Sequence, residues 1–284
     1  MTPAVIVHDD RPCVLGEGAF WHPTREQFFW FDILSGLLMS RDESGARQWD
    51  FGECVSACGW VDEDRLLVAS ETALRLFDIG SGRSEPLVDL EADDPTTRSN
   101  DGRADPAGGF WIGTMGKKAE TGKGAIYRFY EGRVEKLYPA ITIPNAICFT
   151  PAGDAAFFTD TVEGIIKRVA LDASGWPLGE AEPFLDLKRE GLNPDGAVVD
   201  AEGFLWNAQW GASRVARYGP DGRLDRAVEV PSINASCPAF GGADLSRLFV
   251  TSALSELAEP GSSDGLVHVV DIGIKGQAEP RVRL

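Results

Sequence analysis

Four side chains with carboxylate or amide oxygens occupy one position of a sequence unit that recurs along the chain. They are Glu17, Asn100, Asn145 and Asp195. Such oxygens are the ligands of hard divalent cations like Ca²⁺, Mg²⁺ and Mn²⁺, and Zn²⁺ also accepts them. The set contains neither His nor Cys, which argues against a structural zinc site. Two carboxylates at close range repel each other without a cation, so the set predicts one bound divalent cation.

Two kinds of chemistry follow from such a site, and each has a structural alternative. A carboxylate beside a bound cation can take a proton from an attacking water. Arg98 can hold substrate oxygens with its planar set of donors, the alternative being an arginine in a surface turn. The segments 99–102 and 193–196 also resemble ordinary turns, in which Asn and Asp are common. Their shared position in the recurring unit favours the site.

Other kinds of site have less support in the sequence. His8, His22 and His268 lie far apart in the repeat, so no Ser-His-Asp triad is indicated. The glycine pairs at 108–109 and 241–242 precede no helix, so they do not indicate a phosphate cradle. The five cysteines have no zinc-type spacing, and we expect buried, reduced thiols.

The charge balance narrows the class of partner. The chain has 27 basic and 44 acidic residues, a net charge of −17, which disfavours nucleic acid and anionic membrane surfaces. No apolar run reaches the length of a membrane span, and the charged N-terminus does not read as an export signal. We therefore expect a cytoplasmic protein whose partner is a small molecule or a cation. The sequence carries no clear oligomer signal, and a monomer is favoured.

The elements that position these residues come from an internal repeat. A polar turn with Gly, Asp or Glu is followed six times by a short apolar run. The second apolar residue of each run recurs about every 44 residues, and these anchors are Phe29, Leu67, Trp111, Phe157, Trp206 and Phe249. Units of this length with several short strands are typical of propeller blades.

The sequence therefore predicts an all-β, six-bladed β-propeller with four-stranded antiparallel blades, forming one domain over residues 1–284. Residues 4–7 are expected to pair beside residues 266–270, so that N- and C-terminal strands close the ring. Residues 252–258 predict one short helix. The first strand of each blade lines the central channel, eleven or twelve residues before each anchor. That register holds Glu17, Val55, Asn100, Asn145, Asp195 and Cys237.

Several segments in blade order carry a family resemblance. They are 15–21, 98–103, 113–115, 144–145, 159–160, 194–196 and 237–241. With them the chain resembles the gluconolactonase, senescence-marker-protein (regucalcin) and luciferin-regenerating-enzyme family of six-bladed propellers. The resemblance spans almost the whole chain.

The resemblance implies an activity and residue roles. The family hydrolyses sugar lactones to aldonic acids with one divalent cation, so the expected substrate is a sugar lactone. Glu17, Asn145 and Asp195 correspond to its metal ligands, and Asp195 also to its general base. Arg98 and Asn100 correspond to residues that hold substrate oxygens beside the metal.

One segment departs from the family pattern. After residues 113–115 the family often has a longer loop over the site, whereas residues 116–124 here are short and basic. Glu120 on this loop is a candidate substrate contact, the alternative being a solvated loop tip. Lys117 and Lys118 could instead face an anionic substituent. A short loop predicts an open site, which leaves pentono- and hexonolactones both possible.

The leading hypothesis is a lactonase of the carboxylic ester hydrolase class. A non-enzymatic Ca²⁺- or metabolite-binding regulatory propeller needs metal ligands but neither a base nor a substrate clamp, so Asp195 and Arg98 favour the enzyme. A related esterase or phosphotriesterase would use the same residues and stays open. A protein-interaction propeller would leave the oxygen-bearing register without a purpose.

Overall fold

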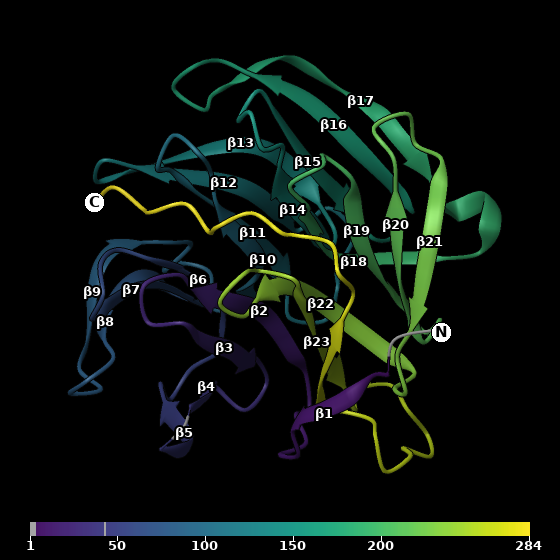
Figure 1. The fold of residues 1–284 in the computed structure, drawn as a ribbon. Helices are drawn as coiled ribbons and strands as arrows, with labels where there is room; N and C mark the ends of the chain where they lie inside the picture. The colour runs from purple at the N-terminus through teal and green to yellow at the C-terminus, as the bar shows by residue number, and fades with distance from the viewer. Residues whose placement is uncertain (1–3, 43) are drawn as a thin grey trace.

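The chain folds into a ring of six antiparallel sheets of four strands each (Figure 1). The computed structural model describes residues 4–42 and 44–284. Residues 1–3 and 43, which the expected 1–284 domain includes, lie outside the described residues. Each sheet runs from an inner strand at the centre of the ring to an outer strand at its edge. The prediction of a six-bladed β-propeller is confirmed.

The first three blades are made by consecutive strands. Blade 1 consists of β2 (Gly16–His22), β3 (Gln27–Asp32), β4 (Leu37–Asp42) and β5 (Gly45–Asp50). Blade 2 consists of β6 (Val55–Trp60), β7 (Arg65–Ser70), β8 (Ala73–Asp78) and β9 (Ser84–Asp89). Blade 3 consists of β10 (Thr97–Ala104), β11 (Phe110–Gly116), β12 (Gly124–Tyr130) and β13 (Arg133–Ile141).

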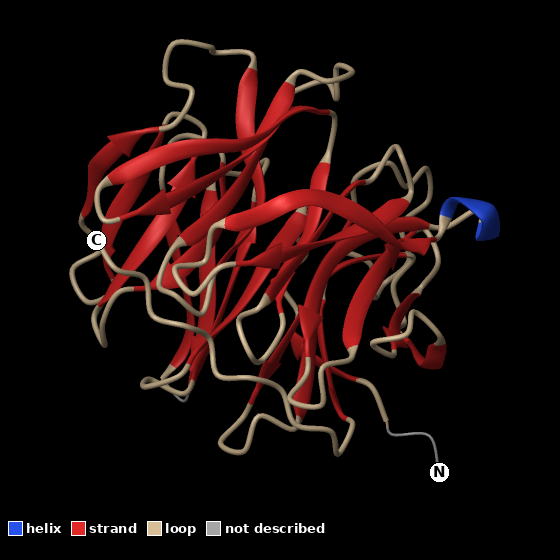
Figure 2. Ribbon diagram, turned by 90° about the horizontal axis from the view of Figure 1, so that it is seen from above, coloured by secondary structure: helices blue, strands red, loops and turns tan. Residues whose placement is uncertain are grey.

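The last three blades follow the same plan, except that blade 6 borrows a strand from the N-terminus. Blade 4 consists of β14 (Pro144–Phe149), β15 (Ala155–Asp160), β16 (Ile165–Leu171) and β17 (Pro177–Asp186). Blade 5 consists of β18 (Asn193–Val199), β19 (Leu205–Trp210), β20 (Arg214–Tyr218) and β21 (Leu224–Glu229). Blade 6 consists of β22 (Asn234–Gly241), β23 (Arg247–Ala253), β24 (Val267–Asp271) and β1 (Ile6–Asp9). Figure 2 shows the 3₁₀ turn η1 (Lys188–Glu190) beside these strands.

The repeated turn that precedes each anchor has a structural role in blades 3 and 5. In blade 5, Asp200 accepts hydrogen bonds from the backbone N–H groups of Glu202 and Phe204, which closes the turn. Its other oxygen accepts from the buried Trp206 and Arg217 side chains, at 2.8 Å each. In blade 3, Asp105 makes the corresponding buried ion pair with Arg128, at 2.7 Å. In both blades the aspartate of the repeated turn therefore fixes the turn to the strands behind it.

The ring closes by pairing of the two ends of the chain. The N-terminal strand β1 pairs antiparallel with β24, with Ile6 opposite Val269 and Val7 opposite His268. The predicted closure is confirmed, although the pairing begins two residues later than expected. This closure gives blade 6 its outer strand without a fourth strand from its own segment.

His8 on the closing strand makes ring closure sensitive to acid. Its ring stands edge-on to Phe28 and Phe249, at 5.6 and 5.0 Å, and burial lowers its pKa to about 4. An unfolded histidine takes a proton near pH 6.5, so its contribution to stability is full above that pH and is lost towards pH 4. We expect His8→Phe to recover up to about 3 kcal/mol of this loss at pH 4. Thermal unfolding at pH 7 and pH 4 checks this, and equal acid losses in both proteins would contradict it.

The segment expected to form a short helix does not do so. Strand β23 extends to Ala253, which bridges Leu15, and the Ser255 N–H then donates to the Val14 carbonyl at 2.9 Å. The prediction for residues 252–258 is wrong because this backbone hydrogen-bonds mainly to the chain entering blade 1, and its internal bond, from the Leu257 N–H to the Leu254 carbonyl at 3.2 Å, closes a single turn. No helix in residues 4–42 and 44–284 is long and apolar enough to cross a membrane.

The C-terminal tail crosses the face of the ring at which the inner strands end (Figure 1). The Gln277 amide donates to the carbonyls of Phe149 and Val199, the last residues of β14 and β18. Glu279 forms a buried ion pair with Arg103 of β10. The tail therefore covers this end of the central channel, and the residues of interest lie nearer the opposite face.

Candidate active site

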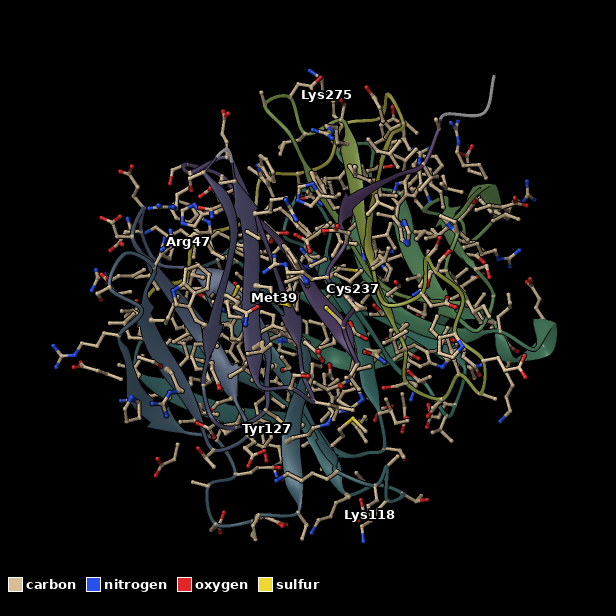
Figure 3. All side chains as sticks on the ribbon, turned by 90° about the horizontal axis from the view of Figure 1, so that it is seen from below. Met39, Arg47, Lys118, Tyr127, Cys237 and Lys275 are labelled. Atoms are coloured by element: carbon tan, nitrogen blue, oxygen red, sulfur yellow. The ribbon has the colours of Figure 1, made fainter. Side chains whose placement is uncertain are left out.

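The oxygen-bearing residues of the channel register lie around one cavity of about 600 Å³ at the open end of the channel. They come from the inner strands of four different blades, and they are Glu17 on β2, Asn100 on β10, Asn145 on β14 and Asp195 on β18. Segments 99–102 and 193–196 lie within β10 and β18, so they are not the turns that the alternative interpretation required. The remaining register residues Val55 and Cys237 are buried, and Cys237 lies near the middle of the molecule (Figure 3).

A β-bulge interrupts every inner strand at this level. The pairing skips between Glu17 and Phe20, between Asn145 and Cys148, and between Pro194 and Ala197, with similar shifts in the other three blades. Bulges bend a strand and redirect its side chains, and they are common next to active sites. The six bulges therefore turn one level of the channel wall towards the axis.

The bulge in blade 1 explains the glycine that follows Glu17. Gly18 has φ +58°, and a Cβ atom there would lie 2.2 Å from the Ser56 carbonyl oxygen. Any larger residue would clash with the neighbouring blade as well as strain the backbone. The Glu-Gly pair of the sequence is therefore required by the close approach of blades 1 and 2.

Two buried carboxyls face the cavity from blades 1 and 5, which flank blade 6. Glu17 is 9% exposed and Asp195 is 4% exposed. Burial raises the pKa of both carboxyls well above their usual values. Neighbouring negative charges raise them further, those of Asp195 and Asp101 acting on Glu17 and that of Asp101 on Asp195. This is an environment in which a positive charge between the two carboxylates is strongly favoured.

The donor set fits a hard divalent cation. Across residues 4–42 and 44–284, no three His, Cys, Asp or Glu side chains are arranged to hold a metal ion. A cation here would therefore use the Asn145 amide oxygen as its third protein donor, beside the carboxylates of Glu17 and Asp195. An all-oxygen set of two carboxylates and one amide matches the preference of Ca²⁺, Mg²⁺ and Mn²⁺.

A chain of hydrogen bonds orients the amides in the cavity. Arg98 Nη1 donates to Asn100 Oδ1 at 2.8 Å, and Asn100 Nδ2 donates to Asn145 Oδ1 at 3.1 Å. Asn145 Nδ2 in turn donates to Thr161 Oγ1 at 2.9 Å, and Thr161 donates to the Pro194 carbonyl at 2.8 Å. The chain links blades 3, 4 and 5, and it fixes which end of the Asn145 amide carries the oxygen.

Arg98 is a buried arginine at the cavity and not a residue of a surface turn. It is 7% exposed, and Nη1 also donates to the Ser99 carbonyl at 2.8 Å. Within the described part of the chain its guanidinium makes no ion pair, and burial lowers its pKa. A buried cation with donors at a cavity is suited to holding electronegative atoms of a ligand.

Exposed apolar side chains form part of the mouth of the cavity. Leu34 and Val162 form part of the wall and are 52% and 58% exposed. The wall also includes Trp210, whose indole N–H donates to Glu256 at 3.3 Å. Sugar rings present apolar C–H faces as well as hydroxyls, so such a mouth is compatible with a small sugar-derived ligand.

The short loop after β11 contributes lysines to the cavity and leaves its glutamate outside. Lys117 and Lys118 line the wall, and Lys117 also pairs with Glu71 at 3.1 Å (Figure 3 labels Lys118 on its loop at the edge of the molecule). Glu120 is exposed, is not part of the wall, and accepts a hydrogen bond from the Lys118 N–H at 3.1 Å. The structure therefore does not bring Glu120 to the other candidate residues, because its carboxylate closes the loop's own turn.

Several polar residues near the site escaped the sequence analysis, and two of them bear on its geometry. Thr161 lines the cavity and links Asn145 to blade 5. Asp101 is buried beneath Asn100, and burial raises its pKa to about 6. Asp101 directly follows Asn100, so its place in the repeat could have identified it. Thr161 lies in the loop after β15, and no feature of the repeat identifies it.

A known protein family and several known proteins match most of the chain. Residues 15–254 match the SMP-30/Gluconolactonase/LRE-like region. The structure of a calcium-binding protein, regucalcin, from Agrobacterium tumefaciens is 42% identical with a TM-score of 0.97, over 99% of this chain and 98% of that one. The L-arabinolactonase of Azospirillum brasilense is 37% identical over 98% of this chain and 95% of its own. A pentonolactonase of Haloferax volcanii is 34% identical over 86% and 83%.

A six-bladed propeller with a polar cavity on its axis defines the structural class of the protein. Within that class, the chain belongs to the SMP-30/gluconolactonase/LRE-like family. The family resemblance seen in the sequence is confirmed. The prediction of a lactonase is also confirmed, because several relatives are named as lactonases.

Proposed function

We propose that this protein hydrolyses a sugar lactone to the corresponding aldonic acid with one divalent cation. The observation that carries the proposal is the meeting of a buried carboxyl pair, an oriented amide and a buried guanidinium at one cavity. The names of the relatives support the substrate class, because they include an L-arabinolactonase and a pentonolactonase.

Glu17, Asn145 and Asp195 would hold the cation, and Ca²⁺, Mg²⁺, Mn²⁺ and Zn²⁺ all accept such oxygen ligands. When bound, the cation would polarise the lactone carbonyl, offset the negative charge that develops on its oxygen and favour the ionised form of Asp195. Arg98 and Asn100 bind oxygens of the sugar and orient the ring.

Asp195 is the general base of the proposed reaction. Its carboxylate takes a proton from a water as that water's oxygen bonds to the carbonyl carbon. The ring C–O bond then breaks, and the proton passes to the departing ring oxygen. Asp195 lies in the cavity wall, where an entering lactone and a water would both reach it.

The main alternative is a protein that binds calcium without turnover. It is supported by the structural relative described as a calcium-binding protein, regucalcin. Such a protein needs the carboxylates and Asn145 but does not require Arg98 at the cavity. A related esterase or phosphotriesterase remains a third candidate and differs only in its substrate.

A panel of aldonolactones tests the proposal. Pentono- and hexonolactones are followed by pH indicator, with metal-stripped protein, with each of the four cations added, and against the spontaneous rate. We expect hydrolysis that depends on the cation, with pentonolactones tested first because two relatives are named for five-carbon lactones. Cation binding without acceleration of any lactone would favour the calcium-binding alternative.

A further inference from the structure

Asp101 is a buried carboxylate beside the cavity that the proposed reaction does not use. It is 8% exposed and is not part of the cavity wall, so it does not reach a ligand. Its Oδ2 accepts a hydrogen bond of 2.7 Å from the backbone N–H of Ile147 on the neighbouring blade. The two residues are 46 positions apart, so this contact joins β10 directly to β14.

Ile147 lies in the bulge that follows Asn145. Asn145 pairs with Thr159, and Cys148 pairs with Phe157. The two residues between them on β14, Ala146 and Ile147, therefore lie opposite the single residue Phe158 of β15. A buried N–H without an acceptor costs about 1–3 kcal/mol. Asp101 supplies this acceptor through one side-chain oxygen, so it is well suited to hold the bulge.

The bulge is also strained, so it needs an anchor. Ala146, between Asn145 and Ile147, has φ +57°, a left-handed conformation that residues other than glycine rarely adopt. In blade 1 the corresponding position is Gly18, which adopts φ +58° without a Cβ atom. Blade 4 keeps the same backbone shape with an alanine, and the Asp101 contact offsets the strain.

Blade 5 holds its bulge by a similar contact. Asn207, fully buried on β19, donates from Nδ2 to the carbonyl oxygens of Asp195 at 2.9 Å and Gly196 at 3.2 Å. A buried polar side chain therefore clamps the bulge behind Asp195, as Asp101 does behind Asn145. The recurrence indicates that the bulges are held by specific contacts and not only by strand pairing.

We infer that Asp101 is a positioning residue, which fixes the β14 bulge and thereby aims the Asn145 amide oxygen into the cavity. The consequence for cation binding rests on the proposed function, in which Asn145 is a ligand. The contact with Ile147 itself does not depend on that function. The carboxylate matters here as a hydrogen-bond acceptor, and its negative charge is secondary.

Two substitutions separate the acceptor from the charge. Asp101→Asn keeps an oxygen that can accept from the Ile147 N–H but removes the charge, whereas Asp101→Ala removes both. Asp105→Ala is the matched control, because it removes another buried aspartate of blade 3 that pairs with Arg128 away from the cavity. It lowers stability without touching the bulge.

The first readout is amide hydrogen exchange in metal-free protein. We expect Ile147 to be protected in the wild type, in Asp101→Asn and in Asp105→Ala, and to exchange at least about tenfold faster in Asp101→Ala. Equal protection of Ile147 in all four proteins would overturn the inference. This result stands whether or not the protein is a lactonase.

The second readout is calorimetric binding of Ca²⁺ and Mn²⁺, measured below the unfolding temperature of every variant. We expect Asp101→Ala to weaken binding by about 10–100-fold, and Asp101→Asn and Asp105→Ala to stay within about threefold of the wild type. Equal losses in the Asn and Ala variants would overturn the inference in favour of a charge effect. A wild type that binds neither ion would instead contradict the proposed function, and the exchange result would still decide the role of Asp101.

Discussion

Replacing Asp195 with Asn should lower kcat/KM for the lactone by about 10³-fold while the protein stays folded. The amide keeps the size of the side chain and one oxygen for a cation, but it cannot take a proton from water. Asp195 is 4% exposed and its pKa is raised by burial, so its charge destabilises the metal-free fold at neutral pH. The thermal midpoint of the metal-free variant should therefore equal or exceed that of the wild type. Initial rates and thermal scans check both results.

Asp264→Asn is a suitable control for this experiment. Asp264 is also buried, at 5% exposed, and accepts hydrogen bonds from Ile233 N–H and Ser232 Oγ in blade 6. These hydrogen bonds outweigh the opposing effect of burial and lower the pKa of Asp264, so its loss should reduce stability and leave turnover of the folded fraction unchanged. If Asp195→Asn retained most of the wild-type turnover, Asp195 would not be the general base.

Glu17→Gln should weaken cation binding by about 10²-fold, because it removes one of two carboxylates from the donor set. The pKa of Glu17 is raised in the metal-free protein, so a bound cation must displace protons held there. Wild-type affinity should therefore rise as the pH rises, and binding should release protons. Titration calorimetry in two buffers of different ionisation enthalpy measures the affinity and the proton release together.

Glu120→Gln provides the matched control for that measurement. It makes the same chemical change on a carboxylate that is exposed and lies outside the cavity wall. We expect cation affinity and kcat/KM to stay within about twofold of the wild type, as is usual for surface changes. Unchanged cation binding in Glu17→Gln would remove Glu17 from the ligand set, and a large loss in Glu120→Gln would restore Glu120 as a substrate contact.

Much of the fold follows from local pattern. All six anchors lie on the second strand of their blades, and the residues counted back from them all lie on inner strands. Counting succeeds because each blade is one supersecondary unit whose turns and buried strands recur at a nearly constant interval. The same regularity places Glu17, Asn100, Asn145 and Asp195 at one cavity from positions up to 178 residues apart in the chain.

Other features depend on contacts that no local pattern encodes. The Glu120 side chain is of a type that can bind a substrate, but its carboxylate accepts a hydrogen bond from the Lys118 N–H of its own loop. Residues 252–258 have helical propensity, but their backbone pairs with the entry to blade 1. In both cases a contact made in the folded chain decides between alternatives that the residue types leave open.

By itself, the sequence determined the number of blades, their strand order and the level of the channel that carries the oxygen-bearing side chains, because these depend on periodicity along the chain. Only the tertiary structure decided the direction of those side chains. The Asp101 contact with Ile147 and the tail over the far end of the channel join different blades, and the bulges and the left-handed Ala146 arise where two strands of one blade pair. Such contacts arise once distant segments are brought side by side, so the repeat predicts where the site lies and the packing of the blades sets its geometry.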